Sequence, residues 1–168
     1  MTIEAINSLT RTGFVEALGW VFEHSPWVAD RAWERRPFAT TEALHTALCD
    51  RVEFATREEQ LALLCAHPDL GTRARVSRAS QTEQSGAGFD QLSPDIFEHL
   101  QHLNSQYREK FGFPFIYAVK GSPPSDILFA LTTRIDSTQE EEFHEALYQV
   151  YRIAYFRVGQ VLDLPPRS

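Results

Sequence analysis

A chain of 168 residues is long enough for one compact domain with a hydrophobic core and too short for two domains of ordinary size. Hydrophobic residues make up 43% and charged residues 23%, a balance typical of globular proteins. The net charge of −7 argues against broad binding to phosphate backbones, and no run approaches the roughly 18 apolar residues that a membrane span requires. We therefore expect a single domain over residues 1–168 that binds neither nucleic acid nor a membrane.

Apolar residues at helical spacing predict two helices in the first 37 residues. The first covers residues 12–24. Ser25-Pro26 then has the form of an N-cap and first turn, and Pro37 ends the second helix. The first helix places Phe14, Leu18, Val21 and Phe22 on one face, and the second carries Trp27, Val28 and Trp33.

Two further helices are predicted before residue 67. One begins near Thr41, and Thr56-Arg57-Glu58-Glu59 has the form of a capping box that opens the next. This second helix ends at His67-Pro68, because proline disfavours helical geometry in the residue before it. The predicted apolar faces comprise Leu44, Leu48 and Val52 in the one, and Leu61, Leu64 and Cys65 in the other.

The second half of the chain is also predominantly helical. Residues 71–90 are irregular in composition and are expected to hold one short helix. Ser93-Pro94-Asp95 begins a helix that lasts until Gly112, and Ser125-Asp126 caps another that ends near Arg134. The longest helix is predicted from about Thr138 to Leu162. The helix that begins at Ser93-Pro94-Asp95 has an apolar stripe made of Phe97, Leu100, Leu103, Tyr107 and Phe111.

Residues 113–119 form the one strand-like run. Pro114 and the lack of a second strong strand candidate favour an extended segment on the core over a sheet. The predicted fold class is therefore all-α: a single-domain helical bundle with one extended segment near residues 113–119.

Common catalytic and metal-binding signatures are absent from the sequence. It contains no phosphate-binding loop, no Gly-x-Ser-x-Gly elbow and no His-Glu-x-x-His pair. His99 and His102 lie off the apolar stripe and are expected on a solvated face, while Cys49 and Cys65 are expected to be reduced core residues. Because the N-terminus carries no secretory signal, we expect a cytoplasmic protein. Because no group of possible ligands has a suitable spacing, we expect no metal.

Three features could together form a site. Ala66 to Gly71 contains His67, which is held at a helix exit by proline and can change protonation near neutral pH. Residues 80–84 are Ser-Gln-Thr-Glu-Gln, in which Ser80 and Glu83 also satisfy the spacing of a capping box. Residues 112–116 form an apolar extended run whose backbone groups could recognise a flat heterocycle.

The chain resembles the 2-oxo-4-hydroxy-4-carboxy-5-ureidoimidazoline (OHCU) decarboxylase family. The resemblance spans nearly the whole chain and depends on several motifs in a fixed order. They are His67-Pro68-Asp69-Leu70, Ser80-x-x-Glu83-Gln84, Leu103-Asn104-x-x-Tyr107, Phe111-Gly112-Phe113-Pro114-Phe115 and Ile153-Ala154-x-x-Arg157. It implies an all-helical homodimer that needs no cofactor and makes (S)-allantoin in urate degradation.

The resemblance also implies which residues form the site. His67 matches the catalytic histidine, and Tyr117 stands where many relatives carry a smaller aliphatic residue. The implied substrate-binding residues, from side chains or from the wall of the site, are Pro68, Ser80, Glu83, Gln84, Phe115, Ile116, Tyr117, Ala118, Val119 and Arg157.

Two other interpretations remain open. A hydrolase of a ureido or cyclic amide bond could use His67 as the base for water and would release no CO₂. A helical protein-interaction module would present the region of Trp20, Trp27 and Trp33 as a docking face, although aromatic residues at helical spacing are more often core.

Overall fold

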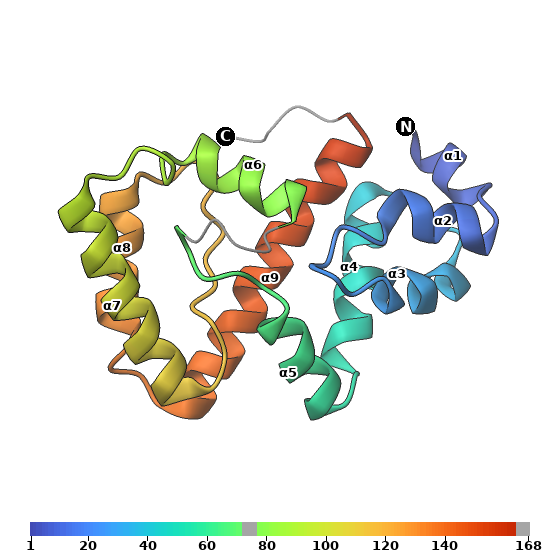
Figure 1. Cartoon of the computed structure of the whole chain (residues 1–168). Coiled ribbons are helices and arrows are strands. Elements are labelled where there is room, and N and C mark those ends of the chain that lie inside the picture. Colours follow the sequence, from blue (N-terminus) through green and yellow to red (C-terminus); the bar gives the residue numbers. More distant parts are fainter. Residues whose placement is uncertain (72–76, 164–168) are drawn as a thin grey trace. The chain divides into compact units, whose positions relative to one another are not determined.

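The structure, a computed structural model, describes residues 1–71 and 77–163, and all regular secondary structure in these residues is helical (Figure 1). This confirms the predicted all-α fold class. Residues 72–76, part of the stretch predicted to be irregular, lie outside the described residues. The elements are α1 Ile3–Asn7, α2 Arg11–Leu18, α3 Trp27–Ala32, the 3₁₀ turn η1 Trp33–Arg35, α4 Thr41–Glu53, α5 Arg57–Cys65, α6 Arg78–Gly86, α7 Pro94–Phe111, α8 Pro124–Arg134 and α9 Gln139–Val161.

The chain divides into two compact units. The first contains Met1–Ala66 together with the chain from Tyr151 onward, and the second contains His67–Val150. Helix α9 therefore contributes its first half to the second unit and its second half to the first. The expectation of one domain over residues 1–168 stays a prediction.

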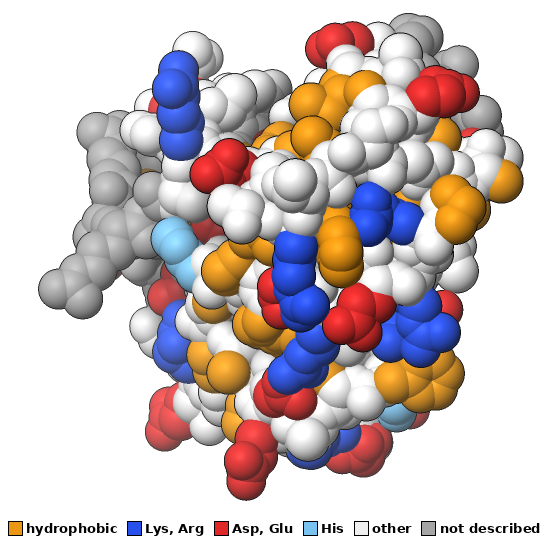
Figure 2. All heavy atoms as spheres, turned by 90° about the vertical axis from the view of Figure 1, so that its right-hand side faces the viewer, with side chains coloured by type: hydrophobic (Ala, Val, Ile, Leu, Met, Phe, Trp, Pro, Cys, Tyr) orange, Lys and Arg blue, Asp and Glu red, His pale blue; other side chains and the backbone are white. Residues whose placement is uncertain are grey.

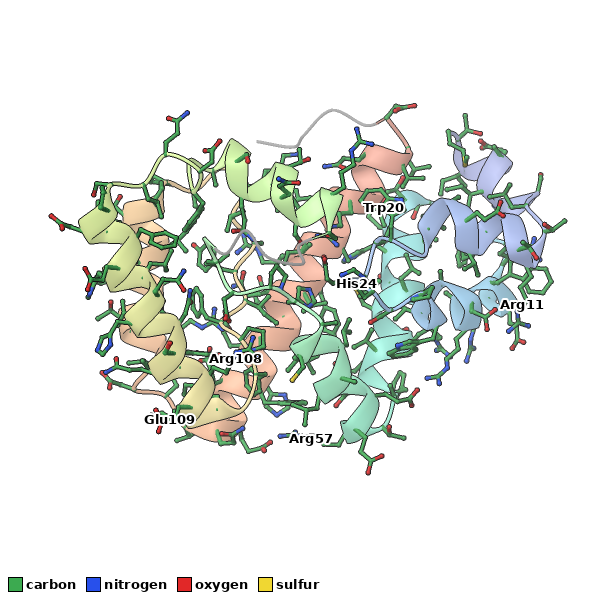
Figure 3. The ribbon with its side chains drawn as sticks, viewed as in Figure 1. Arg11, Trp20, His24, Arg57, Arg108 and Glu109 are labelled. Carbon is green, nitrogen blue, oxygen red and sulfur yellow. The ribbon has the colours of Figure 1, made fainter. Side chains whose placement is uncertain are left out.

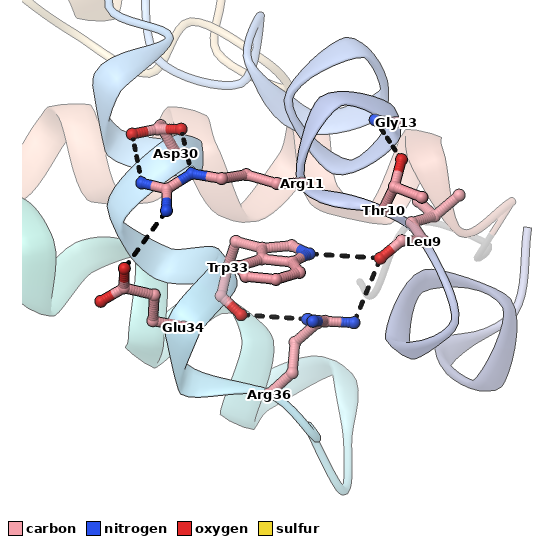
Figure 4. A network of polar contacts seen from close by, with 8 residues as sticks. All are labelled: Leu9, Thr10, Arg11, Gly13, Asp30, Trp33, Glu34 and Arg36. Atoms are coloured by element: carbon pink, nitrogen blue, oxygen red, sulfur yellow. Dashed lines mark hydrogen bonds and ion pairs between the residues drawn. The ribbon is translucent and has the colours of Figure 1, made fainter.

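The first unit is held together by a buried core and by a polar network at its surface. Arg11 donates two hydrogen bonds to Asp30, at 2.7 and 2.8 Å, and so ties α2 to α3 (Figure 4). The Trp33 indole donates to the Leu9 carbonyl at 3.2 Å, and the Arg36 guanidinium lies over the Trp33 ring at 4.1 Å. The buried apolar side chains of this unit include Ile6, Phe14, Leu18, Val28, Leu44, Leu48, Val52, Leu64, Ala154 and Val158.

The core of the second unit is rich in aromatic rings. Tyr107 of α7 contacts Phe111, Phe113 and Phe115 at centroid separations of 4.6, 6.0 and 5.4 Å. Edge-to-face and tilted contacts of this kind stabilise aromatic pairs beyond the area that they bury. The cluster packs the start of the extended segment against the C-terminal half of α7.

Helix α2 ends earlier than the sequence predicts. It stops at Leu18, and the chain passes through a turn in which His24 has a left-handed φ of +46°. Val21 and Phe22 are buried as predicted, but from this turn. Pro26 disfavours helical geometry at Ser25, so the chain leaves the helix before this point. Apolar periodicity alone does not distinguish this compact turn from a further helical turn.

Two predicted N-caps are wrong, and the capping-box spacing of Ser80 and Glu83 is not used by the helix that contains them. Helix α3 begins at Trp27 with Pro26 at its N-cap position, and α8 begins at Pro124, before the expected Ser125-Asp126 cap. Proline is well tolerated at a first helical position, which explains the earlier start of α8. Helix α6 is capped by Ser77, whose hydroxyl accepts a hydrogen bond from the Ser80 N–H at 3.1 Å.

Some residues predicted to be buried are exposed. Phe97, Leu61 and Cys65 lie at the surface of their helices, and Leu63 is buried beside Leu64. His99 and His102 are exposed, as predicted. The error at Leu61 arises because α5 is only nine residues long, so few apolar residues define the orientation of its buried face.

The described surface mixes charged and apolar side chains. On the face in Figure 2, hydrophobic side chains lie among basic and acidic ones. No helix within residues 1–71 and 77–163 combines the length and the apolar character that crossing a membrane would require.

Candidate functional site

His67 is the first residue of the second unit and follows the end of α5. Its side chain is buried, with 6% of its surface exposed, which is uncommon for a polar residue in a loop. Pro68 comes next, and Asp69 accepts a hydrogen bond at 3.1 Å from Arg108 of α7, a residue labelled in Figure 3. This partly exposed contact lies between α7 and the loop that carries His67.

Helix α6 presents the predicted polar residues on one face. Ser80, Glu83 and Gln84 are three and four residues apart, so they share a side of the helix. Ser80 and Gln84 are buried and Glu83 is half-buried. The Gln84 Oε1 accepts a hydrogen bond from the Gly71 N–H at 2.9 Å. The structure therefore joins the Ser-x-x-Glu-Gln motif to the loop that follows His67.

Helix α7 connects this loop to the extended segment. Asn104 and Tyr107 lie three residues apart on its buried face. The Asn104 Nδ2 donates to the Leu70 carbonyl at 3.0 Å, and the Tyr107 ring packs edge-on against Phe115. The Leu-Asn-x-x-Tyr motif therefore has a physical explanation, since its two polar residues hold the two segments that are predicted to bind substrate.

Residues 114–119 are extended and belong to no sheet in the described structure, as predicted. Side chains replace the missing strand partners. Arg134 of α8 donates to the Ile116 carbonyl at 2.8 Å, and Gln149 of α9 accepts from the Ala118 N–H at 3.0 Å.

A buried carboxylate supports the same segment. Glu142 of α9 is 1% exposed and accepts hydrogen bonds from the Tyr107 hydroxyl at 2.5 Å and the Arg134 Nε at 2.6 Å. The Arg134 guanidinium also lies over the Phe115 ring at 4.5 Å. Burial, followed by the hydrogen bond to Glu142, raises the pKa of Tyr107 well above its usual value, so the phenol remains a donor at neutral pH.

The sequence did not reveal this role of Glu142. Glu140, Glu141 and Glu142 are consecutive in the first turn of α9, where negative charge is favoured by the helix dipole. Glu140 and Glu141 are exposed, in agreement with that explanation, whereas Glu142 is buried and paired with Arg134. The apolar Phe143 directly after Glu142 was the available signal, because it marks the start of the buried face.

Arg157 lies in the first unit, where its side chain is 1% exposed. It donates to the Glu23 Oε2 at 3.0 Å and to the carbonyl oxygens of Trp20 and Val21 at 3.3 and 3.4 Å. Trp20 is labelled in Figure 3. Glu23, which accepts the hydrogen bond from Arg157, is buried in the turn after α2 and was not singled out in the sequence. A charged residue directly after the apolar Val21 and Phe22 was the only signal.

Cys49 is poorly suited to act as a nucleophile. Both cysteines are free; Cys49 is half-buried and Cys65 is exposed. The Cys49 Sγ lies 3.3 Å from the His45 Nε2, but burial, followed by the charges of Asp50 and Glu53, raises the pKa of this thiol to about 12. A thiol with so high a pKa carries very little thiolate at neutral pH. Among residues 1–71 and 77–163, no three His, Cys, Asp or Glu side chains are grouped as metal ligands.

Comparison with known proteins places these features in a family. The family model described as "OHCU decarboxylase" matches residues 7–159. The 2-oxo-4-hydroxy-4-carboxy-5-ureidoimidazoline decarboxylase of Haloferax volcanii is 46% identical over 160 residues, which is 95% of each chain. The uric acid degradation bifunctional protein PucL of Bacillus subtilis is 41% identical over 96% of this chain and 33% of its own length.

A solved structure agrees with the sequence comparisons. The crystal structure of (S)-allantoin synthase superimposes with a TM-score of 0.81 at 31% identity, covering 97% of this chain and 55% of that one. A family match over most of the chain, near-full-length relatives and a shared fold all lead to the same conclusion. The chain belongs to the OHCU decarboxylase family.

Proposed function

We propose that this chain decarboxylates OHCU to (S)-allantoin in urate degradation. The observation that carries the proposal is the 46% identity to an OHCU decarboxylase over 95% of both chains. The buried His67, in a loop that α6 and α7 hold from two sides, supports it from the structure. We further propose that the enzyme needs no cofactor, acts as a homodimer and is cytoplasmic, as the resemblance implies.

The substrate itself supplies the chemistry that a cofactor would otherwise provide. Its carboxylate lies on a ring carbon that also bears a hydroxyl and adjoins a C=N bond. When CO₂ leaves, the bonding electrons form a C=C bond to the neighbouring carbon, and the imine nitrogen accepts a proton. The hydroxyl then loses its proton to become the product carbonyl, and the neighbouring carbon gains a proton on one face. The enzyme has to transfer these protons in a fixed geometry.

His67 is the proposed acid–base group for this transfer. In its neutral form it accepts the hydroxyl proton, and its conjugate acid supplies the proton that sets the S configuration. Acid–base assistance of this kind contributes roughly 10²–10⁴-fold to a rate. Its loop position next to Pro68 limits its backbone freedom, which favours delivery to a single face.

The binding residues supply complementary hydrogen bonds in this proposal. Glu83 accepts from ring or ureido N–H groups, while Ser80 and Gln84 lie on the same face of α6. Pro68 and the segment from Phe115 to Val119 form the wall of the site. Arg157 holds a carbonyl oxygen by a charge-assisted bond, because a tight grip on the ground-state carboxylate would oppose its loss.

The competing proposal is a hydrolase that uses His67 as the base for water. Substrate labelled with ¹³C at the carboxylate separates the two. We expect purified chain to release labelled CO₂ faster than a protein-free control. Retention of the label in a ring-opened product would instead support the hydrolase.

Glu83→Gln tests the role of the carboxylate in binding. Because α6 is capped by Ser77, Glu83 does not complete a capping box, and glutamine keeps the shape of its side chain, so we expect this variant to fold. We expect a raised KM or a lowered kcat, since the amide presents one acceptor oxygen where the carboxylate presented two. Steady-state kinetics check this, with thermal unfolding as the control. Wild-type kinetics in a folded variant would contradict the proposed contact.

Activity is also expected to be independent of metal ions. Turnover measured after dialysis against a strong chelator should equal that of untreated protein, because the electron sink lies within the substrate. A loss of turnover that added divalent metal restores would refute this prediction.

A further inference from the structure

The peptide bond between Leu70 and Gly71 is held at both of its ends. Asn104 donates to its carbonyl oxygen at 3.0 Å, and Gln84 accepts from its N–H at 2.9 Å. Both side chains are buried, with 2% and 8% of their surfaces exposed. Two hydrogen bonds in opposite senses to one planar group fix its orientation. We call Asn104 and Gln84 the carboxamide clamp.

The backbone at this peptide has little freedom to adopt another position. Gly71 has a left-handed φ of +78°, and a Cβ atom there would lie 2.9 Å from the Leu100 Cδ2. The Leu70 side chain is only 5% exposed, so the residue that precedes this peptide bond is anchored in the core. The peptide is therefore a fixed point of the loop.

Only two residues separate this fixed point from His67. Pro68 has its φ angle locked by its ring, whereas the 3.1 Å contact between Asp69 and Arg108 is partly exposed and constrains the loop much less than the buried clamp does. A rotation of the Leu70–Gly71 peptide would be transmitted through these two residues to the His67 ring. The orientation of the Leu70–Gly71 peptide and the position of His67 are therefore coupled.

The Asn104 side chain is poorly suited to a purely structural role. Its Oδ1 is buried and accepts no hydrogen bond from the described residues. A buried, unsatisfied amide oxygen is unfavourable, so this carboxamide does not serve the stability of the fold alone. Buried polar groups that lower the stability of a fold are found most often at functional sites.

We infer that Asn104 is a positioning residue for His67. Through the Leu70–Gly71 peptide it holds the histidine where it can protonate one face of the intermediate. This inference rests on the proposed decarboxylase function. It assigns a specific task to the asparagine of the Leu-Asn-x-x-Tyr motif: Asn104 acts on the geometry of proton delivery without touching the substrate.

Two variants of Asn104 test this role. Asn104→Leu keeps the branched shape and removes the donor, while Asn104→Ser leaves room for water. Arg108→Gln is the matched control, because it removes the exposed ion pair to Asp69 on the same loop and leaves the clamp intact. The readouts are thermal unfolding, kcat, KM and the enantiomeric excess of the allantoin formed.

We expect folded Asn104 variants to lose about 10–100-fold in kcat, within the range of an acid–base contribution, with KM changed less than threefold. The enantiomeric excess of (S)-allantoin should fall, because a displaced His67 no longer delivers its proton to one face. Arg108→Gln should retain wild-type kcat and stereochemistry. A merely structural role would lower stability without changing the stereochemistry of the product.

Several results would overturn the inference. They are wild-type kcat and stereochemistry in a folded Asn104 variant, an equal loss in Arg108→Gln, or failure of both Asn104 variants to fold, which would make the residue structural. Absence of CO₂ release by the wild-type chain would instead refute the proposed function, and the inference with it. Normal wild-type turnover with unaffected Asn104 variants would refute the inference alone.

Discussion

The His67→Asn variant is expected to fold normally and to lose catalysis. Asparagine retains a polar, hydrogen-bonding side chain and opens no large cavity in the loop, so the temperature of unfolding should change little. It cannot exchange a proton near neutral pH. The loss of the acid–base contribution should therefore lower kcat by roughly 10²–10⁴-fold, or about 3–5 kcal/mol of transition-state stabilisation. Enzyme kinetics and thermal unfolding of the same preparation measure both effects.

The alternative is that the charge of His67 only complements the dipole at the end of α5. An exposed interaction of that kind is worth about 0.3–1 kcal/mol of stability and nothing in turnover. The 6% exposure of His67 already makes a solvated capping role a poor description. A His67→Asn enzyme with a normal rate, whatever its unfolding temperature, would show that the catalytic assignment is wrong.

The largest expected effect on stability is at the Arg134–Glu142 pair. Arg134→Leu leaves the 1% exposed carboxylate of Glu142 with only the Tyr107 hydroxyl as a donor among the bonds described, and also removes the bond to the Ile116 carbonyl. Removing one partner of a buried ion pair costs about 3–5 kcal/mol. Chemical denaturation should show a fall of this size in the free energy of unfolding.

Arg108→Leu provides the matched control for this measurement. It removes an arginine–carboxylate pair of the same chemistry in the same unit, but both side chains are partly exposed, at 45% for Arg108 and 31% for Asp69. Such pairs contribute about 0–1 kcal/mol. Equal losses in the two variants would contradict the assignment of Glu142 as a buried, structurally essential carboxylate.

Local chemical signals explain what the sequence could predict. The capping box at Thr56, the serine before α7, the proline at its first position and the glycine after it all lie where expected, because each suits the backbone groups that a helix end leaves without an intrahelical partner. The absence of regular secondary structure at residues 114–119 also followed from local chemistry, since Pro114 lacks an N–H and the sequence offers no second strong strand candidate.

The remaining features depend on contacts between segments far apart in the sequence. Glu142 and Arg134 are recognisable as a buried pair only when α8 and α9 are packed together. The same holds for Asn104, whose partner Leu70 is 34 positions away. Apolar periodicity shows which face of a helix is buried, but it cannot show which polar side chain on that face meets a partner. The motifs were identified by resemblance to a family. The structure supplies a physical reason for two of them, Ser-x-x-Glu-Gln and Leu-Asn-x-x-Tyr.

The most direct test of the proposed activity is the chirality of allantoin formed from fresh product of urate oxidation. Protonation in solution reaches both faces of the planar intermediate, so a protein-free reaction gives racemic allantoin. Circular dichroism should show a rapid rise of the (S)-enantiomer with the wild-type chain and only the slow racemic background with His67→Asn. Racemic allantoin formed at the protein-free rate in the presence of folded wild-type chain would contradict the proposed function.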